Sequence, residues 1–220
     1  MSSYPDQGNT ARLNDTYNTE LNGYSAETTM SLHEIDCLSN YLGKSNYYLE
    51  FGSGYSTILA SKLPGISIIS LESDQEYLNF LQQELVHKGI SFSNIEFLHL
   101  DIGPTKEWGY PSSPSSTTVF PNYTLDAMSK LKLVDFTPDL ILIDGRFRVA
   151  SFLWCLLMFP KAIILFDDYL ERDHYHAVEE VLRPKKKVGR IAIFKVPNRI
   201  SRKKTLKALE LVLQYSYEPS

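Results

Sequence analysis

Short apolar segments alternate with helical segments over most of this 220-residue chain, and this alternation constrains its fold more than any other feature. Apolar runs of strand length lie at residues 47–51, 66–71, 95–100, 139–143 and 162–166. Segments with helical spacing lie at residues 55–63, 75–88, 147–158 and 171–182. Because a helix between two strands returns the chain to the same edge of a sheet, the pattern predicts parallel strands joined by right-handed crossovers. We expect an α/β fold of the doubly wound, Rossmann-like type.

Further elements are expected on both sides of this region. Ser31 and Glu34 fit a capping box at the start of a helix that ends at Gly43. Residues 190–196 alternate in part, which predicts a late edge strand. Residues 201–215 have the spacing of an amphipathic helix.

Domain organisation follows from where the periodicity stops. Residues 1–29 show no sustained pattern, which indicates a flexible arm or a lid. Residues 30–200 hold the expected main domain, and residues 201–220 add a C-terminal helix and tail. The pattern also breaks at residues 102–138, where four prolines and a Ser/Thr cluster occur. We expect an irregular insertion there, outside the core, which serves either as a substrate lid or as a surface excursion.

Composition narrows the class of protein. The longest apolar runs are of strand length, so no transmembrane helix is expected. The polar N-terminus does not resemble a signal peptide, and we therefore expect a cytoplasmic protein. Cys37 and Cys155 are far apart in the sequence, which favours reduced thiols over a disulfide or a catalytic pair.

Charge is distributed unevenly. Residues 183–207 carry eleven basic side chains and no acidic one, whereas residues 1–182 carry eleven basic and 24 acidic side chains. The basic segment is either a solvated surface or a patch that attracts phosphorylated substrates, an acidic partner or a membrane surface. Nucleic acid is a weaker alternative, because no recognised binding motif accompanies the patch.

A glycine turn follows the first expected strand. In Glu50-Phe-Gly-Ser-Gly54 the two glycines allow positive φ and a close approach of the backbone to a ligand. Ser56 and Thr57 lie where the start of a helix exposes unpaired N–H groups. Such a turn suits a cofactor that carries a nucleoside.

A carboxylate follows or ends each of the five strands. Ligands of open parallel sheets bind at the carboxyl ends of the strands, so these side chains are expected to lie along one rim. They are Glu50, Glu72, Asp101, Asp144 and the pair Asp167 and Asp168.

Glu72 lies 18 residues beyond Gly54, a separation that places its carboxylate where it can accept both hydroxyls of a ribose. An NAD-dependent oxidoreductase or epimerase would use the same geometry. However, Thr57 replaces the third glycine of the dinucleotide fingerprint, and no Tyr-x-x-x-Lys pair is present. The turn therefore better suits a ligand without phosphates.

These residues resemble the class I S-adenosylmethionine-dependent methyltransferases. The resemblance implies a seven-stranded sheet in the order 3-2-1-4-5-7-6, mostly parallel with one antiparallel strand at its edge. It also implies that the acid-x-Gly-x-Gly turn cradles the methionine part of the cofactor. Glu72, with its neighbour Ser73, would hold the ribose, and Asp101 and Ile102 would flank the adenine. The implied cofactor-binding residues are Glu50, Gly52, Ser53, Gly54, Glu72, Ser73, Asp101, Ile102 and Asp144.

Within that superfamily, three acids are similar to the metal ligands of catechol O-methyltransferase and of macrolide-sugar O-methyltransferases. Asp144, Asp167 and Asp168 would offer hard oxygen ligands, which suit Mg²⁺ better than zinc. Such an ion would lower the pKa of a substrate hydroxyl and orient it for attack. Alternatively, the pair caps the following helix and Asp144 only contacts the cofactor.

One departure concerns the general base. Phe147 stands where the catechol enzymes carry a lysine, which argues against a catechol substrate. His174 is our candidate base together with Asp144, although a lone histidine is often a surface or packing residue. Arg146 and Arg148 either bind a carboxylate, a phosphate or a nucleotide-sugar diphosphate, or pair with the surrounding acids.

The sequence thus predicts a cytoplasmic S-adenosylmethionine-dependent O-methyltransferase. Its substrate would be a small hydroxylated molecule such as a sugar, a nucleotide-sugar or a glycan precursor, with or without Mg²⁺. A homo-oligomer is compatible with the sequence. The alternatives are an NAD-dependent oxidoreductase or epimerase and a non-catalytic cofactor-binding module.

Overall fold

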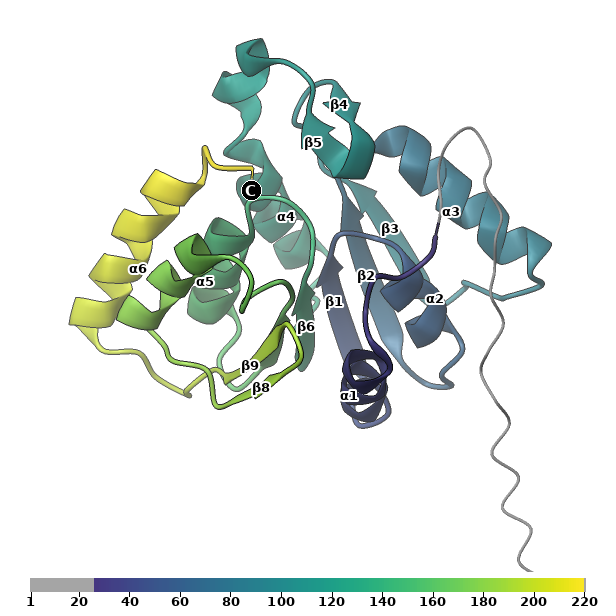
Figure 1. The fold of residues 1–220 in the computed structure, drawn as a ribbon, viewed down its shortest axis with the longest axis horizontal. Coiled ribbons are helices and arrows are strands. Elements are labelled where there is room, and N and C mark those ends of the chain that lie inside the picture. Colours follow the sequence, from purple (N-terminus) through teal and green to yellow (C-terminus); the bar gives the residue numbers. More distant parts are fainter. Residues whose placement is uncertain (1–25, 220) are drawn as a thin grey trace, which may run out of the picture.

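A seven-stranded sheet forms the centre of the computed structural model, which describes residues 26–219 (Figure 1). The predicted order is confirmed, because the first, second and third strands in the chain occupy one half of the sheet and the fourth, fifth, seventh and sixth follow. From one edge to the other, the strands are β3 (Ile95–His99), β2 (Ser67–Glu72), β1 (Tyr47–Phe51), β6 (Leu140–Ile143), β7 (Ile163–Phe166), β9 (Ile191–Lys195) and β8 (Lys186–Val188).

Strand β1 lies at the point where the strand order reverses. It pairs in parallel with β2 on one side and with β6 on the other, so that Glu50 is in register with Ser70 and with Leu142. Ligands of such sheets bind at this reversal point. The topology therefore places the glycine turn after β1 at the expected binding edge.

Strand β9 runs antiparallel to β7, as predicted, but it is not the edge strand. The three-residue strand β8 pairs with its other side. Strand β8 has no periodic pattern in the sequence, because Lys186 and Lys187 are both exposed and only Val188 packs against the protein. Lysines at a short edge strand also discourage pairing with another chain.

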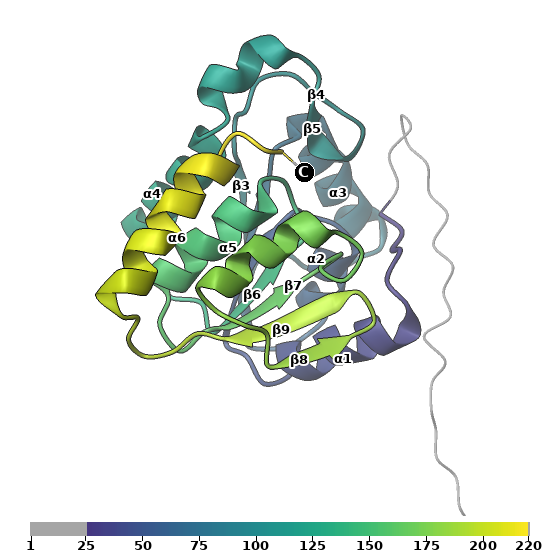
Figure 2. The ribbon, with the colours of Figure 1, turned by 60° about the vertical axis from the view of Figure 1, so that its left-hand side comes forward.

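Helices cover both faces of the sheet, and alternate strand residues face each layer. Tyr48 packs with α1 (Leu32–Leu42) and α2 (Tyr55–Ser61), and α3 (Gln75–His87) extends this layer through Leu81 and Leu85. Leu49 and Phe51 face the larger layer of α4 (Asn122–Leu133), α5 (Arg148–Met158) and α6 (Arg202–Tyr215). Figure 2 shows α6 lying alongside α5.

The insertion at residues 102–138 differs from its prediction. It begins with a small hairpin of β4 (Thr105–Lys106) and β5 (Tyr110–Pro111), joined by the 3₁₀ turn η1 (Glu107–Gly109), and continues through η2 (Pro114–Val119). Helix α4 then buries Tyr123, Ala127 and Leu131 in the main core. The expectation of a segment outside the core was therefore wrong for α4, whose apolar residues do have helical spacing.

Other elements agree with their predictions in most respects. The capping box of α1 is present, with the Ser31 N–H donating to Glu34 Oε2 at 2.6 Å. The segment predicted as a helix at 171–182 is the 3₁₀ helix η3 (Asp173–Glu180). Helix α6 packs Ala208, Leu211 and Val212 into the main core.

Two expectations drawn from composition can also be compared with the fold. Cys37 and Cys155 are both free. Within residues 26–219, no helix has the length and apolar character needed to cross a bilayer. Most of the predicted arm at residues 1–29 lies outside the described residues, and the division at residues 30 and 201 stays a prediction.

Candidate functional site

The glycine turn after β1 packs backbone to backbone against the turn after β6. Gly52 has φ of +92°, and a Cβ built there would lie 2.8 Å from both the N and Cα atoms of Gly145. A Cβ on Gly145 would in turn meet the hydroxyl of Tyr123. Both glycines are therefore required by space, and Gly52 also by its backbone conformation.

Glu50 holds the glycine turn in place through buried hydrogen bonds. Its side chain is fully buried and accepts hydrogen bonds from the hydroxyls of Tyr48 at 2.9 Å, Ser56 at 2.6 Å and Ser70 at 2.6 Å. The hydroxyl of Thr57 donates to Oε1, the oxygen that also accepts from Ser70, whereas Tyr48 and Ser56 donate to Oε2. Burial raises the pKa of Glu50, while these hydroxyl donors oppose the shift. Glu50 thus ties the end of β1 to α2 and β2, and direct contact with a cofactor stays a prediction.

Glu72 lies beside the glycine turn at the end of β2. Its Oε2 accepts the N–H of Ser53 at 3.1 Å, and its Oε1 accepts the N–H groups of Ser73 at 2.7 Å and Asp74 at 3.0 Å. Burial raises the pKa of Glu72, and the three backbone donors counter this shift. The backbone therefore fixes the carboxylate next to Ser53, where a ribose-binding acid is predicted from the sequence.

The β4–β5 hairpin covers Glu72. The Ser73 hydroxyl donates to the carbonyl oxygen of Gly109 at 3.2 Å. A Cβ on Gly109 would lie 2.6 Å from Ser73 Oγ and 3.1 Å from Glu72 Oε1. This part of the insertion consequently lies against Ser73 and Glu72, at the position predicted for the ribose.

The two residues after β3 that are predicted to flank the adenine differ in exposure. Asp101 is exposed, and its Oδ1 accepts the N–H of Gly103 at 2.9 Å. Ile102 is fully buried in the main core. A shallow cleft of about 340 Å³ borders this strand end and includes Ser73, Asp74, His99 and Gly103 among its lining residues. Ile102 is not among the residues that line this cleft, and its contact with an adenine stays a prediction.

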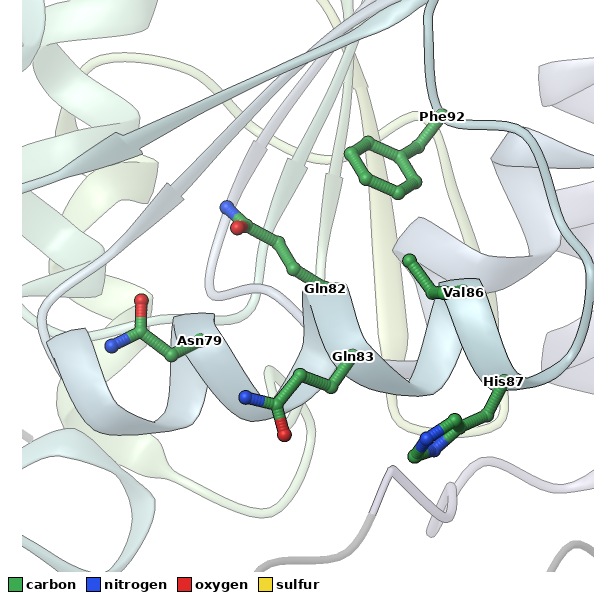
Figure 3. A pocket seen from close by; sticks show the side chains of 6 residues that line it. All are labelled: Asn79, Gln82, Gln83, Val86, His87 and Phe92. Atoms are coloured by element: carbon green, nitrogen blue, oxygen red, sulfur yellow. The ribbon is translucent and has the colours of Figure 1, made fainter.

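A second shallow cleft, of about 420 Å³, lies away from the strand ends. Figure 3 shows that its lining comes from the side of α3 and from Phe92. It contains none of the residues singled out from the sequence, so it is separate from the predicted site.

The structure brings the three predicted metal ligands together. One carboxylate oxygen from each of Asp144, Asp167 and Asp168 lies within 4.8 Å of the others. Burial, followed by the charges of Asp144 and Asp168, raises the pKa of Asp167 to about 7. Burial also raises the pKa of Asp144, against the opposing charge of Arg148.

Three arginines pair with the same carboxylates. Arg148 lies 2.9 Å from Asp144 Oδ1 and 3.1 Å from Asp168 Oδ2. Arg172 and Arg190 each lie 3.1 Å from Asp168, and Arg190 lies 3.6 Å from Asp167. The cluster is therefore an ion-pair network in which three guanidinium groups face three carboxylates.

His174 is not part of this cluster. It is exposed at the start of η3, and its ring packs edge-on against Tyr175 with centroids 4.4 Å apart. His176 Nε2 lies 3.0 Å from the carbonyl oxygen of Tyr169. The role of His174 as general base stays a prediction that no contact in the described residues supports.

Two tyrosines of the site were missed from the sequence. A Cβ on Gly54 would lie 3.4 Å from the hydroxyl of Tyr77, whose pKa is raised by burial and then by the charges of Glu72 and Glu50. The Tyr123 hydroxyl lies 3.2 Å from the backbone N of Arg146. Tyr77 lies in the first turn of α3, three residues after the N-cap Asp74. The cap marks the start of the helix in the sequence, and this was the signal that could have placed Tyr77 near the end of β2.

The chain is similar to a methyltransferase-like protein from Silicibacter pomeroyi. The two are 32% identical, and the alignment covers 88% of this chain and 98% of the other, with a TM-score of 0.77. A putative caffeoyl-CoA O-methyltransferase from Staphylococcus aureus is 12% identical over 86% of this chain and 73% of its own, with a TM-score of 0.46. An RNA methyltransferase from Salinibacter ruber in complex with S-adenosyl-L-homocysteine is 12% identical over 80% and 97%, with a TM-score of 0.48. No protein-family model and no curated protein matches the sequence.

The strand order and the glycine turn at the sheet reversal define a protein with the class I methyltransferase fold. The similarity at 32% identity over nearly the whole of both chains shows the family as well. This chain belongs to the family of the Silicibacter pomeroyi methyltransferase-like protein.

Proposed function

We propose that the protein is an S-adenosylmethionine-dependent methyltransferase that acts on a hydroxyl group of a small molecule. The observation that carries the proposal is the 3.1 Å hydrogen bond from the Ser53 N–H to Glu72, which holds the carboxylate that we expect to bind the ribose beside a two-glycine turn. Membership of a methyltransferase-like family supports the same activity.

The contacts of Thr57 argue against a dinucleotide. Its Oγ1 accepts the N–H of Gly54 at 2.9 Å and donates to the buried Glu50. A pyrophosphate held at this turn needs free backbone N–H groups at the start of the helix. Because Gly54 already has a partner, the turn suits a ligand without phosphates at this position.

S-adenosylmethionine supplies a methyl group on a positively charged sulfur, which an acceptor oxygen can attack in line. Glu72 would hold the ribose hydroxyls, and the backbone of Gly52 and Gly54 would allow the methionine part to lie close to β1. The chain would contribute mainly by orienting the acceptor and excluding water, and orientation alone accounts for large rate factors. His174 or Asp144 would take the acceptor proton.

Metal assistance remains a separate part of the proposal. Three carboxylate oxygens within 4.8 Å suit a hard divalent cation, and Asp144, Asp167 and Asp168 would hold it. The ion would polarise an acceptor hydroxyl. Because three arginines already pair with these acids, a cation must compete with Arg148, Arg172 and Arg190 for them.

The acceptor class rests on the predicted site. We infer a small hydroxylated molecule such as a sugar, a nucleotide-sugar or a glycan precursor. The β4–β5 hairpin supports a small acceptor, since it lies over the strand ends and would close on a ligand of limited size. A cytoplasmic location and a homo-oligomeric state stay predictions.

A thermal-shift experiment tests the cofactor. S-adenosylhomocysteine should raise the melting temperature of the full chain in a saturable manner, and NAD should not. Stabilisation by NAD alone would favour the oxidoreductase alternative. Absence of a shift with either compound would favour the non-catalytic module.

A second experiment tests the metal. Mg²⁺-dependent activity should be lost in Asp168→Asn, while the affinity for S-adenosylhomocysteine should be retained. Equal activity in Mg²⁺ and in EDTA would contradict metal assistance.

A further inference from the structure

Arg146 is a buried arginine that forms no ion pair with a carboxylate among residues 26–219. Only 6% of its surface is exposed, and its Nε and Nη1 atoms have no hydrogen-bond partner among residues 26–219. No carboxylate in that part of the chain lies within 4.0 Å of its guanidinium group, although such pairs surround its neighbour Arg148. Burial of an unpaired charge is unfavourable. A ligand that supplies an anionic group would offset this cost.

The neighbouring arginine has a different role. Arg148 donates from Nε to the carbonyl oxygen of Gly145 at 2.9 Å and from Nη1 to that of Asp167 at 3.0 Å. It also pairs with Asp144 and Asp168. The two arginines of this segment therefore differ, since Arg148 pairs with carboxylates and carbonyl oxygens of the fold, whereas Arg146 has no carboxylate partner and leaves Nε and Nη1 without a hydrogen-bond partner among residues 26–219.

Tyr110 of the hairpin occupies the space next to Arg146. The Arg146 guanidinium lies 4.1 Å from the centre of the Tyr110 ring. Burial raises the pKa of Tyr110, but the charge of Arg146 and hydrogen bonds from Arg172 and Arg146 outweigh it, so that the pKa lies below its usual value. The phenol oxygen therefore sits between two guanidinium groups, where an oxygen of an anionic ligand would also be stable.

The position of Arg146 in the sheet favours the acceptor over the cofactor. Arg146 follows β6, whereas Glu72, the proposed ribose-binding residue, ends β2, and these two strands flank β1 on opposite sides. With the ribose at Glu72, the nucleoside would occupy the side of β2 and β3. The side of β6 and β7 would then be left for the second substrate.

We propose that Arg146, together with Arg172, binds a carboxylate or phosphoryl group of the acceptor substrate, and that Tyr110 fills this place until the hairpin moves. The assignment of the anion to the acceptor rests on the proposed methyltransferase function. The presence of an anion site does not, because it follows from the buried Arg146 guanidinium, which has no carboxylate partner and leaves Nε and Nη1 unbonded among residues 26–219, and from Tyr110 beside it.

Isothermal titration calorimetry tests the site directly. The full chain, saturated with S-adenosylhomocysteine, is titrated with inorganic phosphate and separately with acetate at constant ionic strength. We expect saturable binding of at least one anion, and the tighter of the two identifies the group. Arg146→Gln should weaken this binding about tenfold or more, because a charge-assisted contact is lost. Arg183→Gln is the matched control, since Arg183 is largely exposed and distant in sequence, and it should bind the anion as the wild type does.

A second variant keeps the test independent of the folding of Arg146→Gln. Tyr110→Phe removes the competing oxygen and should tighten anion binding. Unchanged anion affinity in both variants, or no saturable binding of either anion to the wild type, would overturn the proposal. Equal weakening of anion and S-adenosylhomocysteine binding in Arg146→Gln would also overturn it, since Arg146 would then serve the cofactor. Arg146-dependent phosphate binding by a chain that does not bind S-adenosylhomocysteine would support the anion site and contradict only the methyltransferase function.

Discussion

Asp144 Oδ1 lies 2.9 Å from Nη2 of Arg148, the residue four positions later in the first turn of α5. Arg148 is almost fully buried and also bridges to Asp168 at the end of β7. A single guanidinium group thereby holds the ends of β6 and β7 together. Buried ion pairs of this kind are sensitive to the loss of one partner, which leaves uncompensated charges behind.

Replacement of Arg148 should therefore destabilise the fold. We expect Arg148→Ala to lower the free energy of unfolding by about 3–5 kcal/mol, because Asp144 and Asp168 would each lose a buried partner. Chemical denaturation measures the change. Arg183→Ala, whose side chain is largely exposed and lies 3.9 Å from Glu179, should change the same quantity by less than about 0.5 kcal/mol. A loss of similar size in both variants would show that the Arg148 network contributes nothing specific.

Glu72 should determine the affinity for the cofactor. We expect Glu72→Gln to raise the Kd for S-adenosylhomocysteine by about 10- to 100-fold, because one charged acceptor of the ribose hydroxyls is lost. Calorimetry gives the Kd, and the melting temperature shows whether the variant is folded. Glu96→Gln, at an exposed position of β3, is the control and should bind as the wild type does. An unchanged Kd in Glu72→Gln would remove Glu72 from the ribose role.

The turns after β1 and β6 pack so closely that a Cβ at Gly52 should destabilise the fold. Gly65 also has positive φ, at +78°, but a Cβ there meets no atom within 4 Å. Gly65→Ala should therefore cost only the left-handed backbone strain of about 1–2 kcal/mol. Gly52→Ala should cost clearly more, since its Cβ would lie 2.8 Å from backbone atoms of Gly145. Equal losses in free energy of unfolding would contradict the close packing of these two turns.

Much of the sheet could be predicted because its strands are local in sequence. The apolar runs that precede Glu50, Glu72 and Asp144 identify the strands directly, and parallel pairing then places the carboxylates at one edge. The acidic cluster followed from the same logic, since β6 and β7 are neighbours.

The partners of that cluster could not be predicted in the same way. Arg190 belongs to a basic segment whose composition suggests a solvated surface or a binding patch, yet it pairs with Asp168 and with Glu34, which is 156 residues away. Only the placement of β8 and β9 brings these residues together. The contact between Tyr110 and Arg146 depends likewise on the path of the first part of the insertion, before α4, which has too little periodicity to be predicted from sequence.

The bond between Glu34 and Arg190 leads to a prediction on pH. Glu34 Oε1 accepts the Arg190 N–H at 2.5 Å, and although burial raises its pKa, this bond and those from Ser31 lower it below the ordinary value of 4.5. A carboxyl group with a lowered pKa in the folded state stabilises the fold above the unfolded pKa, and this contribution is lost as the pH falls through the folded pKa. Glu34→Gln should therefore be less stable than the wild type by about 1–3 kcal/mol at pH 6–7, and the difference should shrink below about pH 4.5. Denaturation curves from pH 3 to pH 7 test this, with Glu96→Gln as the exposed control. A difference that grows as the pH falls would contradict the sign of the Glu34 shift and with it the contact that joins α1 to the turn between β8 and β9.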